Sequence, residues 1–563
     1  MGYSQSNLSG AAYGYDFVVA TTQESINATM KAYLAGLNAP EVIQCYIYNQ
    51  NNQPQLIDYN TLLQQAGITD LFGIPNGTSA QDDRLVKLAN VGFAYAFKAA
   101  IGLPAGYAPT AIPDVVTLNP STSTVVFNLM CSSFTVVELT YGPRNQNTWL
   151  NQSQQPGNAW TFTSNVALQN ITVGSNAYNK LPPAVQQQIG NMGANAFSVQ
   201  QLLFDLDNAA LESVPQITGV VPGTPLYTAL QTVFLGAYFT QMQAEGQPVL
   251  SYTIAQTTTD HSSLPLTALE LEANAYVDGN GTPVQSPSAA EQQVQPLCYL
   301  CATNGNTLRP PTQFNWNWID LTEASQHQGV MAINRNTLAN WIGAQLAPQL
   351  GANCYNPSVR VWLSGFLDTT VNYQWGLTSG QTPTQTLNAS GPNVLTFSWQ
   401  SGTAEDDAGA GGDMGKMELS SSFNVNVSFQ GNTIVITQHL VVYAYVRSLA
   451  TGDGGNIVDK TITDTYTLAV DQNGNLMATQ TTSTQDNSQS PGTNGFLNFF
   501  TDLNSLLDSA KTWANNFAGA RLQSLPISVV QNFVFPGGNT FTFSDVCFSN
   551  NQDMVSHITY VQP

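Results

Sequence analysis

Charged side chains are scarce in this chain of 563 residues, because Asp, Glu, Lys and Arg together make up only 9% of it, whereas about 25% is usual for a soluble protein. The few charges are unbalanced, with 14 basic against 35 acidic residues and a net charge of −21. Binding of nucleic acid needs clustered Lys and Arg to neutralise phosphates, and no such cluster occurs. The same shortage excludes attraction to anionic membranes through a basic patch, so contact with lipid would have to be apolar.

Long apolar runs are also lacking. No stretch approaches the roughly 18 consecutive apolar residues of a membrane helix, so no integral membrane segment is predicted. The segment from Met1 to Tyr15 has neither the basic nor the apolar region of a secretory signal. The six cysteines are too few for a disulfide framework in a chain of this length. We therefore expect a cytoplasmic protein, or one released without a classical signal peptide.

Motifs for catalysis and metal binding are missing as well. No HExxH or GxSxG sequence occurs, and the histidines are not spaced as metal ligands; they are His261, His327, His439 and His557. The pair Cys298 and Cys301 forms a CxxC without a second pair, which favours two buried thiols of a strand over a zinc site. We predict no catalytic residue, no metal site and no cofactor, and hence a protein that is not an enzyme.

Acidic residues gather in the Gly-rich segment 401–416 without the spacing of an EF-hand; they are Glu405, Asp406, Asp407 and Asp413. An exposed loop is favoured over a calcium site there. The polar segment 481–494 is likewise predicted to be an exposed loop.

Apolar residues that recur at every second position predict antiparallel sheet. The pattern is present in Phe423, Val425, Val427 and Phe429, in Val125, Phe127, Leu129 and Cys131, and in Phe541 and Phe543. Turn sequences separate such runs at Gly279-Asn280-Gly281, Gly431-Asn432 and Asn473-Gly474. Alternation with tight turns indicates a β-meander with one buried face.

A spacing of three and four predicts helices between these strands. The first would begin at a capping box of Thr21 and Glu24 and extend to Leu37. A second would run from an N-cap at Thr224 to Gln243. A third, over 494–522, carries a wide apolar stripe that includes Phe499 and Phe500.

Several stretches, in order along nearly the whole chain, resemble the TULIP-type (tubular lipid-binding) proteins of the clostridial OrfX and forty-seven-kilodalton neurotoxin-cluster family. They are YDFVVATTQESINATMKAYL from Tyr15, FAYAFKAAIGLP from Phe93, IPDVVTL from Ile112, FSVQQLLFDLDNAAL from Phe197, FNWNWIDL from Phe314, AINRNTLANW from Ala332 and FVFPGGNTFTFSDVCFSNNQDMVSHITY from Phe533.

The resemblance implies an α+β, β-rich fold of two elongated TULIP-like modules, each a strongly curved antiparallel sheet wrapped around a long helix. We expect the first module over 1–310, with an N-terminal helix that docks on the other module. The second, over 311–563, would contain the long C-terminal helix and a hairpin. The boundary lies in the Pro-rich stretch around Arg309.

Two functions stay open at this point. The chain could hold a lipid or other apolar molecule in a tubular cavity, with a role in a toxin cluster. Alternatively, it could be a structural or interaction protein with a filled core that assembles with a partner protein. Candidate ligand-lining residues are aromatic: Phe314, Trp316 and Trp318, which alternate along a predicted strand, and Phe499 and Phe500 of the third helix.

Overall fold

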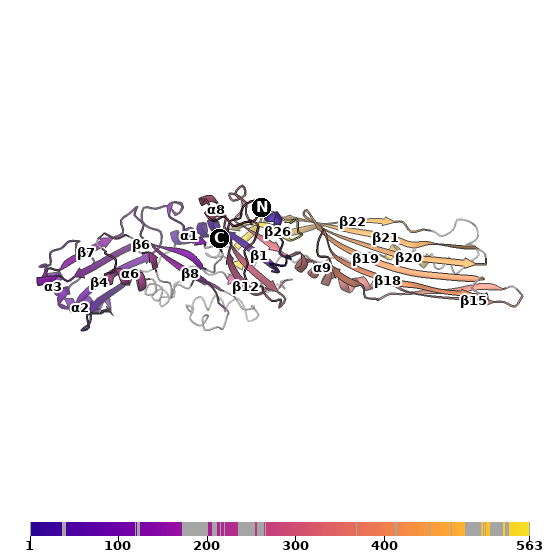
Figure 1. The fold of residues 1–563 in the computed structure, drawn as a ribbon, viewed down its shortest axis with the longest axis horizontal. Helices are drawn as coiled ribbons and strands as arrows, with labels where there is room; N and C mark the ends of the chain where they lie inside the picture. The colour runs from indigo at the N-terminus through magenta and orange to yellow at the C-terminus, as the bar shows by residue number, and fades with distance from the viewer. Residues whose placement is uncertain are drawn as a thin grey trace.

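The fold was analysed in a computed structural model of the chain. It describes residues 2–36, 41–118, 120, 124–171, 201–204, 211–213, 216–218, 220–234, 254–255, 264, 266–367, 369–410, 414–449, 451–474, 476–489, 508–509, 512, 514–517, 533–534 and 540–561. These residues form an elongated, β-rich molecule in which three antiparallel sheets follow one another along the long axis (Figure 1). The predicted β-rich class is therefore confirmed.

The first sheet lies at the end of the molecule that the N-terminal third of the chain builds (Figure 1). Its strand order is β23 (Phe533–Val534), β11 (Ile254–Ala255), β9 (Gln201–Phe204), β8 (Thr161–Ile171), β6 (Thr124–Thr140), β4 (Phe93–Ile101), β2 (Val42–Tyr48) and β3 (Pro54–Ile57). Three short strands lie beside this path, namely β10 (Leu211–Ser213) against β8, and β5 (Val116–Leu118) and β7 (Thr148–Ser153) against β6. Helices α2 (Tyr59–Ala66) and α3 (Asp83–Asn90) pack on its outer end.

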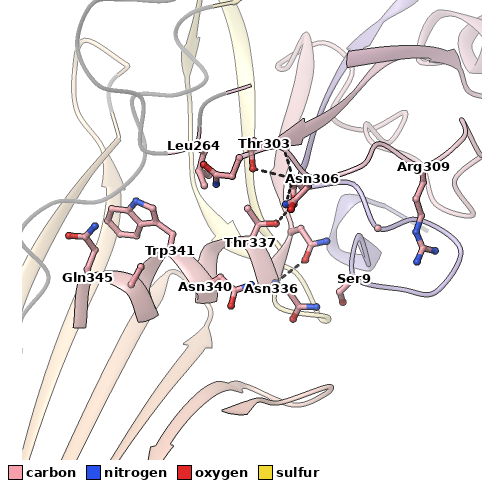
Figure 2. Close-up of a pocket in the computed structure, with 15 residues that line it drawn as sticks. Ser9, Leu264, Thr303, Asn306, Arg309, Asn336, Thr337, Asn340, Trp341 and Gln345 are labelled. Carbon is pink, nitrogen blue, oxygen red and sulfur yellow. Dashed lines mark hydrogen bonds between the residues drawn. The ribbon is translucent and has the colours of Figure 1, made fainter. Parts of the chain in front are cut away.

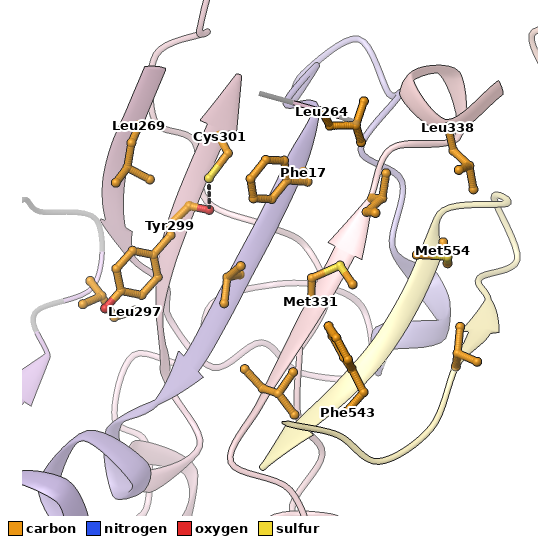
Figure 3. Close-up of a cluster of buried hydrophobic side chains, with 14 of the residues drawn as sticks. Phe17, Leu264, Leu269, Leu297, Tyr299, Cys301, Met331, Leu338, Phe543 and Met554 are labelled. Atoms are coloured by element: carbon orange, nitrogen blue, oxygen red, sulfur yellow. Dashed lines mark hydrogen bonds between the residues drawn. The ribbon is translucent and has the colours of Figure 1, made fainter. Parts of the chain in front are cut away.

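The central sheet joins segments from both ends of the chain. Its strand order is β12 (Leu266–Ala273), β13 (Pro296–Thr303), β1 (Phe17–Thr22), β14 (Gly329–Ile333), β26 (Met554–Val561) and β24 (Thr540–Phe543), with β25 (Cys547–Phe548) against β26. Alternation along β1 sends Phe17 and Val19 to the large apolar core and Val18 and Ala20 to a separate cluster on the other face. Figure 3 shows the first of these faces.

The third sheet is a meander of long strands, as the period-two pattern predicts. Its order is β17 (Thr384–Leu387), β18 (Asn393–Ala408), β19 (Gly415–Gln430), β20 (Thr433–Ser448), β21 (Thr451–Val470) and β22 (Leu476–Asp486). Along β19, Phe423, Val425, Val427 and Phe429 are all buried, which confirms the predicted face. The hairpin of β15 (Asn356–Ser364) and β16 (Thr370–Thr378) packs against β18 and β19. Helix α9 (Arg335–Leu350) connects the central sheet to this one (Figure 1).

One predicted loop is wrong, and a second is wrong over 481–486. In the segment 401–416, residues 403–408 belong to β18 and pair in register with residues 415–420 of β19. The segment 481–494 begins as the last part of β22, which pairs with β21 as far as Asp486. Polar, Gly-rich composition resembles that of a loop, but backbone pairing with a neighbouring strand forms a sheet from such residues as well.

The first helix begins later than predicted. Helix α1 spans Gln23–Gly36. Thr22 caps its N-terminal end, because the Thr22 hydroxyl accepts a hydrogen bond of 3.2 Å from the Ser25 amide. The capping box of Thr21 and Glu24 is therefore wrong. Thr21 belongs to β1 and donates a hydrogen bond to the Leu297 carbonyl of the neighbouring strand.

The second helix, α6 (Pro225–Thr232), begins as predicted, because Thr224 accepts a hydrogen bond from the Tyr227 amide. It ends at Thr232, before the predicted end at Gln243. Residues 235–243, and most of the predicted helix 494–522, lie outside the described residues. Within 494–522, the described residues 508–509, 512 and 514–516 are helical. A further short helix, α8 (Ala289–Gln293), begins at a complete capping box of Ser288 and Glu291.

The proposed division at residue 310 stays a prediction. The central sheet takes strands from both sides of that position, since β1 lies between β13 and β14. Helix α1 contacts β5, and its Asn27 hydrogen-bonds the backbone of Val115 and Val116, which also belong to 1–310. The described sheets are not strongly curled (Figure 1), and modules wrapped around a long helix likewise stay a prediction.

Candidate binding pocket beside helix α9

A pocket of about 840 Å³ lies where helix α9 meets the central sheet (Figure 2). The N-terminal segment, the turn after β13 and one side of α9 build its wall. Most of the lining groups are amides and hydroxyls: Ser9, Gly14, Asp16, Leu264, Thr303, Asn304, Asn306, Arg309, Asn334, Asn336, Thr337, Asn340, Trp341, Ala344 and Gln345.

The start of α9 is fixed by its N-cap. The Asn334 side chain accepts a hydrogen bond of 2.8 Å from the Asn336 amide and donates one of 2.9 Å to the Tyr15 carbonyl. Positions spaced three and four apart then face the pocket, among them Thr337, Asn340 and Trp341. Since Asn340 is exposed, the pocket opens to solvent along this side of the helix.

Asp16 forms the centre of the polar network on the sheet side. Its carboxylate accepts hydrogen bonds from the Thr303 amide at 2.7 Å, the Thr303 hydroxyl at 3.1 Å, the Asn306 amide group at 2.9 Å and the Thr337 hydroxyl at 2.7 Å. Figure 2 shows Thr303, Asn306 and Thr337 close together on this side of the pocket. With both oxygens engaged, the carboxylate ties the sheet to α9 and has little capacity left to act as a general base.

Arg309 supplies the positive charge of the pocket. Its guanidinium donates to the carbonyl of Ala11, and its side chain passes close to Gly14. Gly14 has a φ of +77°, and a Cβ built there would lie 2.8 Å from Nε of Arg309. Glycine therefore provides both the left-handed backbone and the space that this arginine occupies.

One end of the pocket is apolar. Leu264 and Trp341 line it and also belong to the large apolar core that includes Phe17 and Met331. Figure 3 shows Leu264 beside Phe17 at the edge of this core. The pocket thus combines a polar wall of amides, hydroxyls and one guanidinium with an apolar end, which suits an amphipathic molecule.

The predicted aromatic residues Phe314, Trp316 and Trp318 lie elsewhere. They are buried in the cluster on the other face of the central sheet, with ring centroids 4.8 to 5.4 Å apart. The predicted strand is wrong, because this segment is irregular backbone held by polar contacts such as that of Asn317 with the Val277 amide. Their ligand-lining role stays a prediction, and Phe499 and Phe500 lie outside the described residues.

The other residues singled out by sequence are structural where they are described. Cys298 and Cys301 are buried, unpaired thiols of β13 on opposite faces of the sheet, which confirms that prediction. Glu405 and Asp406 lie on β18, where Glu405 pairs with Lys416 at 3.2 Å and Asp406 accepts from the Val361 amide. Asp407 is exposed on the same strand, and Asp413 lies outside the described residues.

The histidines have different settings. His439 pairs with Asp459 at 2.9 Å on the third sheet, and His261 lies outside the described residues. His327 and His557, 230 positions apart in the sequence, stack with ring centroids 4.0 Å apart. No spacing rule could find that pair, because β14 and β26 become neighbours only in the folded sheet.

Sequence reasoning also missed helix α9 and therefore the pocket. A signal was present, because Asn334 precedes apolar residues at a spacing of four, Leu338, Ile342 and Leu346, as an N-cap precedes an amphipathic helix. In the described part of the chain, no helix has both the length and the apolar character to cross a bilayer.

Comparisons with known proteins were made by sequence and by structure. No family model matches the chain, and no curated protein matches its sequence. Two P47 proteins are similar in structure. That of Clostridium botulinum A2 has a TM-score of 0.40 at 11% identity and is matched over 97% of both chains.

The P47 protein of Clostridium botulinum E1 has a TM-score of 0.44 at 10% identity, over 97% of this chain and 98% of that one. A structure of lipopolysaccharide binding protein has a TM-score of 0.28 at 10% identity, over 98% of this chain and 100% of that one. P47 proteins, the kind of protein that the sequence resemblance names, are thus among the structural neighbours of this chain.

Proposed function

We propose that this chain is a non-enzymatic binding protein that holds an amphipathic, lipid-like molecule at helix α9. The observation that carries the proposal is the composition of the pocket, whose polar wall ends at Leu264 and Trp341 of the large apolar core. The polar part of the ligand would contact Asn336, Asn340 and Arg309. The TULIP-type resemblance of the sequence supports the lipid class.

Binding of this kind would draw most of its energy from apolar burial, at about 25 cal/mol per Å². Trp341 is the largest apolar side chain of the lining and is 9% exposed. The amides around it would fix the orientation of the polar part through hydrogen bonds. No step in this scheme needs a catalytic group, and Asp16 is already fully hydrogen-bonded.

Native mass spectrometry of the purified full chain, followed by organic extraction, tests the proposal. We expect a stoichiometric lipid-like adduct whose retention falls by about tenfold in Trp341→Ala, as loss of a buried aromatic contact implies. Trp362→Ala is the matched control, because Trp362 lies on the hairpin strand β15 and is 38% exposed. Asn340→Lys, a change at an exposed pocket position, provides a second variant that keeps the core intact.

A second candidate is an interaction protein with a filled core that assembles with a partner protein. The complete burial of Phe423, Val425, Val427 and Phe429 favours it, because side chains that border an open lumen would retain exposed surface. Phe517 packs edge-on against Phe423 with ring centroids 5.8 Å apart. A clean mass of the unliganded chain, with no uptake from a mixed lipid panel, would exclude the first candidate and favour this one.

A further inference from the structure

A cluster of two imidazoles and two carboxylates lies at the edge of the central sheet, away from the α9 pocket. His557 is on β26, His327 and Glu323 are in the turn segment before β14, and Asp545 follows β24. His327, Asp545 and His557 can each offer a ligand atom such that all these atoms lie within 4.8 Å of one another.

The orientation of His557 is fixed by Asp545. The carboxylate accepts hydrogen bonds from the backbone amide of His557 at 2.8 Å and from its Nδ1 at 2.7 Å. A carboxylate on Nδ1 places the proton there and leaves Nε2 with a free lone pair, as in carboxylate–histidine–metal triads.

That free nitrogen lies at the centre of the cluster. His557 is 2% exposed, and its Nε2 has no hydrogen-bond partner among the described residues. A buried ring nitrogen of this kind is costly unless a ligand or proton donor satisfies it. Oε2 of Glu323 lies 3.9 Å from this nitrogen. Two ligands that each lie about 2 Å from a tetrahedral ion are about 3.3 Å apart, so Glu323 would move closer to His557 by about 0.6 Å on binding.

His327 lies against the imidazole of His557. Its ring stacks on that of His557 at 4.0 Å with an interplanar angle of 20°, and its Nδ1 is 3.2 Å from the Ser544 hydroxyl. The possible ligand atoms of His327 and His557 lie within 4.8 Å of one another. The lone pairs of stacked rings are nearly parallel, so His327 would rotate out of the stack to reach an ion beside Nε2 of His557. Two imidazole nitrogens with a carboxylate oxygen are a ligand set that zinc prefers, with a fourth position left for water.

We propose that His557, His327 and Glu323 bind one divalent transition-metal ion of the zinc class, with Asp545 as the residue that positions His557. The ion would link the segment before β14 to the C-terminal strand β26. Tyr3 packs edge-on against His557, with ring centroids 4.4 Å apart, so the N-terminal segment would be held at the same point.

The test uses the full chain, without a histidine tag, after chelator treatment and dialysis. Titration with Zn²⁺ against a chromophoric chelator should give one equivalent bound per chain, and Co²⁺ should give the visible bands of a low-coordinate site. His327→Gln and Glu323→Gln should each weaken binding by about tenfold or more. Both residues are partly exposed, so these variants should fold even if a His557 variant does not.

His439→Gln is the matched control, because it removes a histidine that pairs with a carboxylate on the third sheet. Zinc affinity should stay unchanged in this variant. The proposal is overturned if the chain binds no stoichiometric Zn²⁺. It is equally overturned if His327→Gln and Glu323→Gln bind like the parent, or if His439→Gln loses as much affinity as they do.

Discussion

The hydroxyl of Ser6 donates a hydrogen bond of 2.8 Å to the carboxylate of Asp553, although 547 positions separate the two residues. The same carboxylate accepts from the amides of Leu8 at 2.6 Å and Arg335 at 3.0 Å. Asp553 therefore joins the N-terminal segment, the start of α9 and the C-terminal strands at one buried point. Any ligand at α9 binds to a frame that depends on this junction.

Asp553→Ala should destabilise the protein strongly. Burial raises the pKa of Asp553 to about 6, so the group is ionised at neutral pH and its loss leaves buried donors unpaired. We expect a loss of about 3 kcal/mol in the free energy of unfolding, measured by urea denaturation. Asp407→Ala, at an exposed position on β18, is the control and should change it by less than about 0.5 kcal/mol. Equal effects of the two variants would contradict the role of the junction.

Glu138→Gln should stabilise the protein at alkaline pH. Glu138 lies on β6 opposite Tyr95, and burial raises the pKa of its carboxyl to about 7 from 4.5. Between these values the folded state binds more protons than the unfolded state, so stability of the parent falls as pH rises through this range. In Glu138→Gln the side chain does not titrate, so the stability of the variant does not fall with pH for this reason.

The difference in stability between Glu138→Gln and the parent should be near zero at pH 4.5 and reach about 1 to 2 kcal/mol above pH 7. Urea unfolding at a series of pH values measures it. A difference that does not change with pH would show that Glu138 titrates normally.

Phe423→Ala tests whether the third sheet encloses a filled core. Phe423 is fully buried and packs against Phe517, so its truncation should cost about 3 to 5 kcal/mol. Asn424→Ala, on the other face of the same strand, should cost less than about 1 kcal/mol. A cost for Phe423→Ala as small as that of the control would instead indicate open space beside this side chain.

The thiols should react slowly in the folded protein. Burial raises the pKa of Cys45 to about 12, that of Cys354 and Cys547 to about 11, and that of Cys298 and Cys301 well above the usual value. A thiol reagent at pH 8 should therefore modify few of them, because the thiolate is the nucleophile. In guanidinium all six should react, since all are free. Fewer than six without reductant would reveal a disulfide, and a fast native reaction would contradict the burial.

Local pattern predicted much of the secondary structure. Along β19 the alternation of Phe423 with Asn424 was sufficient, because a strand exposes successive side chains to opposite faces whatever lies around it. The N-cap at Thr224 and the turn at Gly431 depend on short-range backbone chemistry and were also predicted correctly. Where chain composition was ambiguous, as in 401–416, pairing with a neighbouring strand overrode the local preference.

The sequence by itself determined the class of the protein. The alternating apolar pattern indicated a β-rich fold, because the period of a pattern depends only on the order of residues. Tertiary structure alone decided which distant residues meet. Asp16 meets Thr337, Ser6 meets Asp553, and His327 meets His557, since the central sheet brings β1, β14 and β26 together from both ends of the chain. Contacts of that range depend on how strands pair, which no local spacing specifies.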